Sequence, residues 1–278
     1  MPLSVSIDHP AASSAVPAPA SICDSTPEPE TPCNPGKYRP LETPNIFPAL
    51  RSAVIHGSTF IHTSASPTSK GQCRVLISSP LADTNSLIMQ WILEAIKESE
   101  DVLWLYGSAG AGKSAIAQSI AEKCAKLNLL VASFFFSRAS PSRNNEKFLI
   151  ASIAYQLAIS IPVTRSYIES AIQIDPAVFD RSLDTQIETL IIQPLENAYA
   201  VVNPADAKQW PRLIIIDGLD ECHDPLIQRS IIHVLSAALL RITFPILLVA
   251  SRPEPHIRHA FNTLNKSHAS RHIVLDDS

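Results

Sequence analysis

The sequence has no excess of positive charge: its 278 residues include 22 lysines and arginines against 26 aspartates and glutamates, for a formal net charge of −4. A chain of this charge has no sequence-wide electrostatic footprint for nucleic acid or an anionic lipid surface. It also lacks an apolar run of about 18 residues, the length needed to cross a bilayer. No lysine or arginine precedes Lys37, so the start does not resemble a secretory signal. We therefore expect a cytoplasmic protein with no membrane span and no nucleic-acid partner.

Cysteine is scarce, at five residues. These cysteines are scattered and lack the paired short spacings of a zinc site or a redox dithiol, which indicates reduced thiols. The nine histidines form no HExxH pattern. The sequence also contains neither a GxSxG nucleophile elbow nor an NKxD element after a late strand. These absences disfavour a zinc hydrolase, a serine hydrolase and a GTPase.

Proline divides the chain into regions of different character. Eleven of the 23 prolines lie within residues 1–50, mixed with serine, threonine and alanine. Such a composition cannot bury enough apolar surface to offset chain entropy. We expect residues 1–45 to be a disordered tail, and residues 46–83, whose apolar residues show no sustained period, to be a linker. The tail is either an inert leader, which we favour, or a site for partners and phosphorylation.

From about residue 84 onward, apolar strands alternate with helical stretches, and Thr84 or Asn85 is expected to cap the first helix. Five nearly continuous apolar runs are typical of parallel strands buried on both faces. They are residues 102–107, 129–137, 212–218, 245–251 and 271–276. The alternation predicts a doubly wound α/β domain over residues 84–278, with a mostly parallel five-stranded sheet and a ligand at the carboxyl ends of the strands.

The first strand leads into a Walker A phosphate-loop pattern. It matches GxxxxGK[ST] in full and precedes a predicted helix, which is the context that the motif requires. The residues are Gly107, Ser108, Ala109, Gly110, Ala111, Gly112, Lys113 and Ser114. Glycines allow backbone N–H groups to wrap a triphosphate closely. We expect all eight residues to bind nucleotide, with Lys113 on the β- and γ-phosphates and Ser114 as a ligand of Mg²⁺.

A magnesium-dependent loop of this kind needs a carboxylate at the end of a neighbouring strand. The run Leu213–Asp217 ends in one, so we expect Asp217 to serve the metal. Two more carboxylates follow, and we expect Glu221 to be the base that activates water, with Asp220 as the second candidate. Alternatively, both carboxylates simply start the next helix, where negative charge suits the helix dipole.

The fourth strand ends in Ser251-Arg252, and we expect Arg252 to sense the γ-phosphate. The alternative is an ordinary surface arginine before a proline-rich turn, with Ser251 as a helix cap. Arg138, which follows the second strand, is a weaker candidate that we expect to be a solvated loop residue.

Five segments together resemble the NACHT module of the STAND signal-transduction NTPases, and most closely fungal forms with a nephrocystin-3-like amino-terminal domain. They read YGSAGAGKSAIAQSIAE, ASFFFSR, FLIASIAYQLA, LIIIDGLDEC and LLVASRPEP. The resemblance implies that the phosphate-loop strand lies between the strand ending at Ser251 and the last strand. It also implies the same roles for Lys113, Ser114, Asp217 and Arg252.

The resemblance implies an ATP-binding switch of the kind used in innate-immunity-like signalling. Mg-ATP would favour an assembly-competent state, slow ATPase turnover would return an ADP state, and the partners would be further copies or related NTPases. Such proteins continue into a helical domain and a winged helix, so we expect a form truncated after the NTPase core. The alternative is a non-hydrolysing interaction module or a regulatory fragment of a longer NACHT protein.

Overall fold

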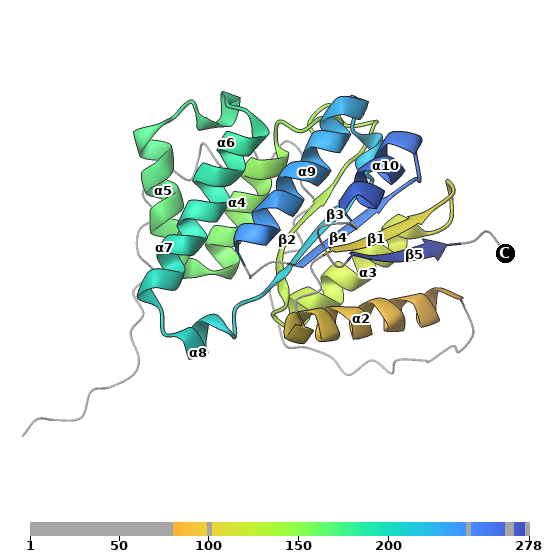
Figure 1. Cartoon of the computed structure of the whole chain (residues 1–278), viewed down its shortest axis with the longest axis horizontal. Coiled ribbons are helices and arrows are strands. Elements are labelled where there is room, and N and C mark those ends of the chain that lie inside the picture. The colour runs from red at the N-terminus through yellow and green to blue at the C-terminus, as the bar shows by residue number, and fades with distance from the viewer. Residues whose placement is uncertain (1–79, 99–101, 243–245, 265–269, 276–278) are drawn as a thin grey trace, which may run out of the picture. The chain divides into compact units, whose positions relative to one another are not determined.

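The computed structural model describes residues 80–98, 102–242, 246–264 and 270–275 (Figure 1). The predicted tail over residues 1–45, and the predicted linker up to residue 79, lie outside these residues. Within the described part of the chain, no helix is long and apolar enough to cross a membrane.

A five-stranded sheet runs through the described domain, with all strands parallel and in the order β2-β3-β4-β1-β5. The strands are β1 (Val102–Gly107), β2 (Leu130–Phe135), β3 (Leu213–Asp217), β4 (Ile246–Ser251) and β5 (Ser270–Leu275). The predicted fold class, the doubly wound α/β fold of P-loop NTPases, is confirmed. As expected, β1 lies between β4 and β5.

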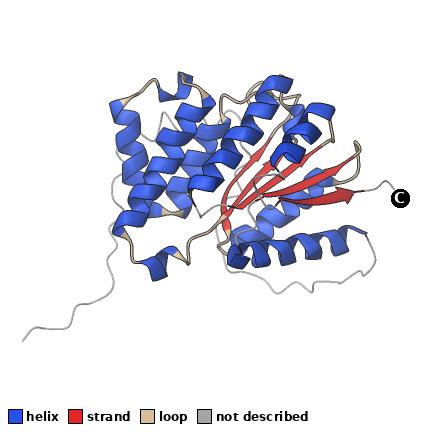
Figure 2. Cartoon of the chain, viewed as in Figure 1, coloured by secondary structure: helices blue, strands red, loops and turns tan. Residues whose placement is uncertain are grey.

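Helices cover both faces of this sheet (Figures 1 and 2). One face packs against α2 (Pro80–Glu98) and α3 (Lys113–Lys126), and the other against α4 (Leu149–Ser160), α9 (Pro225–Arg241) and α10 (Pro255–Leu264). Because successive strand side chains point to opposite faces, Leu103 and Trp104 of β1 belong to different cores. This double burial explains why the strands read as continuous apolar runs.

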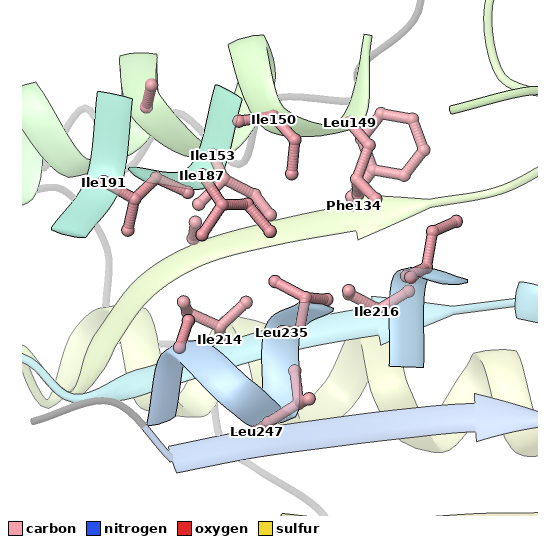
Figure 3. Packing of buried hydrophobic residues seen from close by; sticks show 14 of the residues in the cluster. Phe134, Leu149, Ile150, Ile153, Ile187, Ile191, Ile214, Ile216, Leu235 and Leu247 are labelled. Atoms are coloured by element: carbon pink, nitrogen blue, oxygen red, sulfur yellow. The ribbon is translucent and has the colours of Figure 1, made fainter. Parts of the chain in front are cut away.

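Further helices extend the α4 side of the domain. They are η1 (Pro162–Thr164), α5 (Arg165–Ile174), η2 (Val178–Asp180), α6 (Leu183–Ile187), the π-helical η3 (Glu188–Ile192), α7 (Gln193–Val201) and α8 (Pro204–Ala207). Figure 3 shows Ile187 and Ile191 from this group beside Ile153 of α4, above strand β2, and Phe134 of β2 lies further along the strand near Leu149. On the same face, Leu235 of α9 lies over β3 and β4.

Two helix predictions were wrong in detail. α2 begins at Pro80, so Thr84 and Asn85 lie inside the helix and do not cap it. Proline is well suited to the first position of a helix, because its N–H would have no partner there. The sequence TQIETLIIQPLENAYAVV, residues 185–202, is typical of one continuous helix, but the π-helical turn beside Pro194 divides it. Proline removes a backbone donor and its ring clashes with the carbonyl four residues earlier, which accounts for the irregularity.

Candidate nucleotide-binding site

The phosphate loop links β1 to α3 at the carboxyl end of the sheet. Its three positions occupied by glycine require that residue for different structural reasons. Gly110 and Gly112 have φ values of +87° and +84°, in the left-handed region that favours glycine. Gly107 is needed for a close approach, because a Cβ there would lie 2.5 Å from the carbonyl oxygen of Leu275 in β5. The loop conformation therefore depends on all three positions.

Lys113 is the first residue of α3, and its side chain folds back over the loop. Its Nζ donates to the carbonyl oxygens of Gly107 at 2.9 Å and Ser108 at 2.6 Å. The ammonium group is thus held beside the backbone that would enclose phosphates. An anion in the loop would compete for the same three donors.

A cavity of about 290 Å³ lies at the loop and is lined from three parts of the chain. The phosphate loop contributes Lys113 and Ser114, the end of β3 contributes Asp217, and Glu221 and Arg252 complete the opposite side. Ala109, Gly110, Gly112, Gly218 and Asp220 also line it. Gly107, Ser108 and Ala111 belong to the loop but do not line the cavity. The structure therefore brings together every predicted catalytic and metal-binding residue at one place.

Asp217 is a buried carboxylate with an unsatisfied oxygen. The residue is 4% exposed, and its Oδ1 has no hydrogen-bond partner among the residues that the structure describes. Burial raises the pKa of this carboxyl to about 6, with further raising by the charges of Glu221 and Asp220, against lowering by hydrogen bonds from Ser114 and Gly218. A hard divalent cation would both satisfy the free oxygen and favour the ionised form.

The hydroxyl of Ser114 and the carboxyl of Asp217 therefore fit Mg²⁺ in the chemistry of their donor atoms. Among the described residues, no three His, Cys, Asp or Glu side chains are arranged to hold a metal on their own. In phosphate-binding sites, Mg²⁺ is usually held by one or two protein side chains and takes its other ligands from phosphates and water.

Asp220 and Arg252 form an ion pair in the wall of the cavity. Asp220 Oδ1 accepts from the backbone N–H of Arg252 at 2.9 Å, and Oδ2 accepts from Nε at 2.7 Å. The Asp220 side chain is 4% exposed and that of Arg252 is 35% exposed. The hydrogen bond to Asp220 and its charge raise the pKa of the guanidinium, which stays charged. Both oxygens of Asp220 are thus occupied, which makes it a poor candidate for a general base.

The pairing uses only the Nε edge of the Arg252 side chain. Its two terminal nitrogens make no hydrogen bond to the described residues, and Arg252 lines the cavity. An arginine held in this way differs from the ordinary surface arginine that was the alternative. Its role as a γ-phosphate sensor stays a prediction.

Glu221 is more available than Asp220. It is half-buried, and only its Oε2 accepts a hydrogen bond from the described residues, from the backbone N–H of Arg138 at 3.0 Å. Because the other oxygen has no such partner and the residue lines the cavity, Glu221 is the better placed carboxylate for holding a water near phosphate.

A short turn carries both carboxylates, and it is separate from the next helix. Gly218 has φ +68°, and residues Leu219–Glu221 form the 3₁₀ helix η4. We call residues 218–222 the acidic turn. A Cβ at Gly218 would lie 3.2 Å from the carbonyl oxygen of Phe136. α9 begins only at Pro225, capped by the Asp224 side chain. The alternative in which the two carboxylates start that helix is therefore wrong.

Two side chains at the site were misread from the sequence. Arg138 is exposed, as expected, but its guanidinium donates to the carbonyl oxygen of Asp220 at 2.9 Å, so it contacts the acidic turn and is not a free loop residue. Ser251 is fully buried and caps no helix; the indole N–H of Trp104 donates to its hydroxyl at 2.9 Å. No sequence signal connects Trp104 to Ser251, because they are 147 residues apart.

Comparison with known families gives one match that covers more than half of the chain. The profile of the family described as nephrocystin 3, N-terminal, matches residues 84–252. A search of curated proteins found no match.

Two solved structures show weaker likenesses. A chain of the Drosophila ORC bound to poly(dA/dT) DNA and Cdc6 aligns with a TM-score of 0.42 at 10% identity, over 79% of this chain and 37% of that one. A Walker-type ATPase of Pyrococcus abyssi aligns with a TM-score of 0.42 at 11% identity, over 70% of this chain and 53% of that one. The present chain thus spans little more than a third of the first structure and about half of the second.

Proposed function

The chain belongs to the nephrocystin 3 N-terminal family, and we propose that it is an Mg-dependent, ATP-binding switch of the NACHT type that hydrolyses ATP slowly. One observation carries the proposal. A single cavity joins the phosphate loop, a buried carboxylate with a free oxygen, and an arginine held by an ion pair. The proposed NTPase domain comprises residues 84–278, preceded by the first residues of α2.

Binding in this proposal begins at the phosphate loop. Backbone N–H groups of the loop and the amino-terminal end of α3 attract phosphate oxygens. Lys113 exchanges its two carbonyl contacts for the β- and γ-phosphates. Ser114 and Asp217 would hold Mg²⁺, which when bound supplies positive charge to the phosphates.

Hydrolysis requires a water positioned for attack on the γ-phosphorus. Glu221 accepts a hydrogen bond from this water through its free oxygen and takes up the proton as the new P–O bond forms and the bond to ADP breaks. Arg252 directs its terminal nitrogens at the γ-phosphate and stabilises the charge that develops there. Because Asp220 already fixes Arg252, little reorganisation is needed when ATP arrives.

The signal in this proposal is the presence or absence of the γ-phosphate. Arg252 can contact that group only in the ATP state, so the β4–α10 segment and the acidic turn are under different forces in the two states. Self-association or co-assembly with related NTPases would read this difference, in the cytoplasm. The fungal NACHT assignment rests on the sequence pattern, above all on LIIIDGLDEC and LLVASRPEP.

Thermal unfolding tests nucleotide binding directly. The wild type and Lys113→Ala are each measured without ligand and with Mg-ATP, Mg-ADP or Mg-GTP. A ligand at a hundredfold its Kd adds about 2.7 kcal/mol, which corresponds to several degrees in a domain of this size. We expect the wild type to shift with adenine nucleotides and Lys113→Ala not to shift. Lys126→Ala, an exposed change in the last turn of the same helix, should shift like the wild type. A folded wild type that shifts with no nucleotide would overturn the proposal.

A further inference from the structure

A partly buried chain of hydrogen bonds lies beside the Asp220–Arg252 pair and joins α9 to α10. Gln228, in the first turn of α9, is 3% exposed. Its Nε2 lies 2.6 Å from the carbonyl oxygen of Cys222 and 3.5 Å from that of Asp220. Its Oε1 lies 2.6 Å from Nε2 of His256, at the start of α10. None of these contacts takes part in the proposed chemistry.

The geometry determines which atom donates in each contact. A carbonyl oxygen can only accept, so the amide nitrogen of Gln228 must face Cys222 and Asp220. The amide oxygen then faces His256, whose Nε2 must carry a hydrogen. Both the neutral Nε2–H tautomer and the charged ring meet this condition. The chain therefore has one consistent direction, from His256 to Gln228 to the backbone of the acidic turn.

These contacts attach the segment that carries the predicted sensor, Arg252, to the acidic turn at two points. Arg252 is bonded to the side chain of Asp220, and His256, four residues later, is bonded through Gln228 to the backbone of the same turn. The segment from Arg252 to His256 is thus attached to the acidic turn at both of its ends. A movement of one would have to break a buried hydrogen bond or carry the other with it.

Packing holds the apolar residues of the turn, because Leu219 and Cys222 are buried in the core, but the two carboxylates of the turn line cavities. Asp220 and Glu221 line the nucleotide cavity on one side, and both also line a second cavity of about 350 Å³ on the other. His223, Gln228 and His256 border this second cavity. The core packing fixes the backbone of the turn, and the directions of its two carboxylates depend in addition on hydrogen bonds.

We propose that Gln228 and His256 are positioning residues for Arg252, which set how well the site distinguishes ATP from ADP. The inference rests on the proposed function, in which Arg252 contacts the γ-phosphate. Without the His256–Gln228 bond, the Arg252 segment is attached to the acidic turn only through the Asp220–Arg252 pair, so the His256 end of the segment can move away from the turn. The guanidinium then spends less time directed at the γ-phosphate, so the affinity for ATP falls. The affinity for ADP does not change, because ADP has no γ-phosphate and is bound by the phosphate loop.

The test compares the ratio of two affinities in full-length variants. Isothermal titration with Mg-ADP and with a non-hydrolysable Mg-ATP analogue gives the Kd for each. Arg252→Ala should lower the preference for the ATP analogue roughly tenfold, as expected for one lost charge-assisted contact. His256→Leu should lower the preference roughly threefold. Kd for ADP should change less than twofold in either variant.

Three further variants separate positioning from a general effect on folding. His256→Gln places an amide donor near the position of Nε2 and should restore the wild-type ratio. His259→Leu changes an exposed histidine of the same helix and should leave the ratio unchanged. The double variant Arg252→Ala/His256→Leu should match Arg252→Ala alone, because His256 acts through Arg252. If His256→Leu does not fold, His256→Asn, which is too short to reach Gln228, replaces it.

The outcomes distinguish this inference from the proposed function. An unchanged ratio in His256→Leu, together with a lowered ratio in Arg252→Ala, would overturn the positioning role and leave the switch intact. Full additivity in the double variant would do the same. If Arg252→Ala itself leaves the ratio unchanged, or the wild type binds neither nucleotide, the sensor assignment fails and the positioning role fails with it.

Discussion

Asp217→Asn is expected to abolish magnesium-dependent function and yet stabilise the ligand-free protein at neutral pH. Burial raises the pKa of this carboxyl from 3.8 to about 6, so ionising Asp217 in the folded state costs free energy. At about 1.4 kcal/mol per pKa unit, the cost at neutral pH is about 3 kcal/mol. Asparagine has nearly the same shape and carries no charge, so the variant avoids this cost.

The pH dependence has a definite sign. Well below pH 3.8 the carboxyl of Asp217 is protonated in both the folded and the unfolded chain, so the wild type then bears no cost of ionisation. As the pH rises from 3.8 towards the folded pKa of about 6, the wild type loses stability because the carboxyl ionises in the unfolded chain before it ionises in the folded one. The advantage of the variant should therefore grow between pH 4 and about 6 and then level off.

Thermal unfolding of both proteins between pH 5 and pH 8, without nucleotide, measures this difference. We expect Asp217→Asn to gain several degrees in Tm at pH 8 and about half as much at pH 5. Glu122→Gln, which neutralises an exposed carboxylate of α3, should show no such trend. A gain that does not increase with pH, or a variant less stable than the wild type at pH 8, would refute the burial argument. With Mg-ATP present, only the wild type should be further stabilised, since the variant lacks the metal-binding carboxylate.

Three other changes test separate parts of the site. Glu221→Gln should keep the affinity for ATP while phosphate release falls by about 10²–10⁴-fold; ATP binding without any release in the wild type would instead favour the non-hydrolysing module. Asp220→Asn should still release phosphate but should weaken the ion pair that positions Arg252. The preference for an ATP analogue over ADP, measured by titration calorimetry, should therefore fall. An unchanged preference would contradict the positioning role of Asp220. Gly107→Ala should lower the free energy of unfolding by about 1–3 kcal/mol in urea titration, because its Cβ would lie 2.5 Å from a backbone oxygen of β5; an unaffected midpoint would show that β5 can move away.

The sequence was most informative where a local pattern determines structure. The strands are buried on both faces, so their apolar runs could be located to within about two residues. α10 was missed, although Ile257, Ala260, Phe261 and Leu264 have the i, i+3, i+4, i+7 spacing of a helix and are all buried. α5 gives a weaker signal, because only Ile168 and Ile172 are buried in it.

The candidate site could be predicted only in its linear parts. Lys113 and Asp217 follow from a motif and from a strand end, but the pairing of Asp220 with Arg252 depends on β3 and β4 being neighbours. Parallel strands place their carboxyl ends side by side, so the proximity of these residues could be expected while their hydrogen bonds could not. The contacts of Gln228 and His256 are harder to predict. Gln228 donates to backbone carbonyls, which every residue has, and His256 is connected to them only through the Gln228 side chain.

The charged groups nearest the phosphate loop are placed so that they can form further contacts with a ligand. Asp217 has a buried oxygen without a partner, Lys113 donates to backbone carbonyls that carry no full charge, and Arg252 has two terminal nitrogens that bond to none of the described residues. The groups one step further out, Asp220 and Gln228, are fully engaged. The inner set gains most from a magnesium-bound triphosphate, and the satisfied outer set keeps the inner one in place. Binding should therefore change the inner contacts first, and reach α9 and α10 only through the acidic turn.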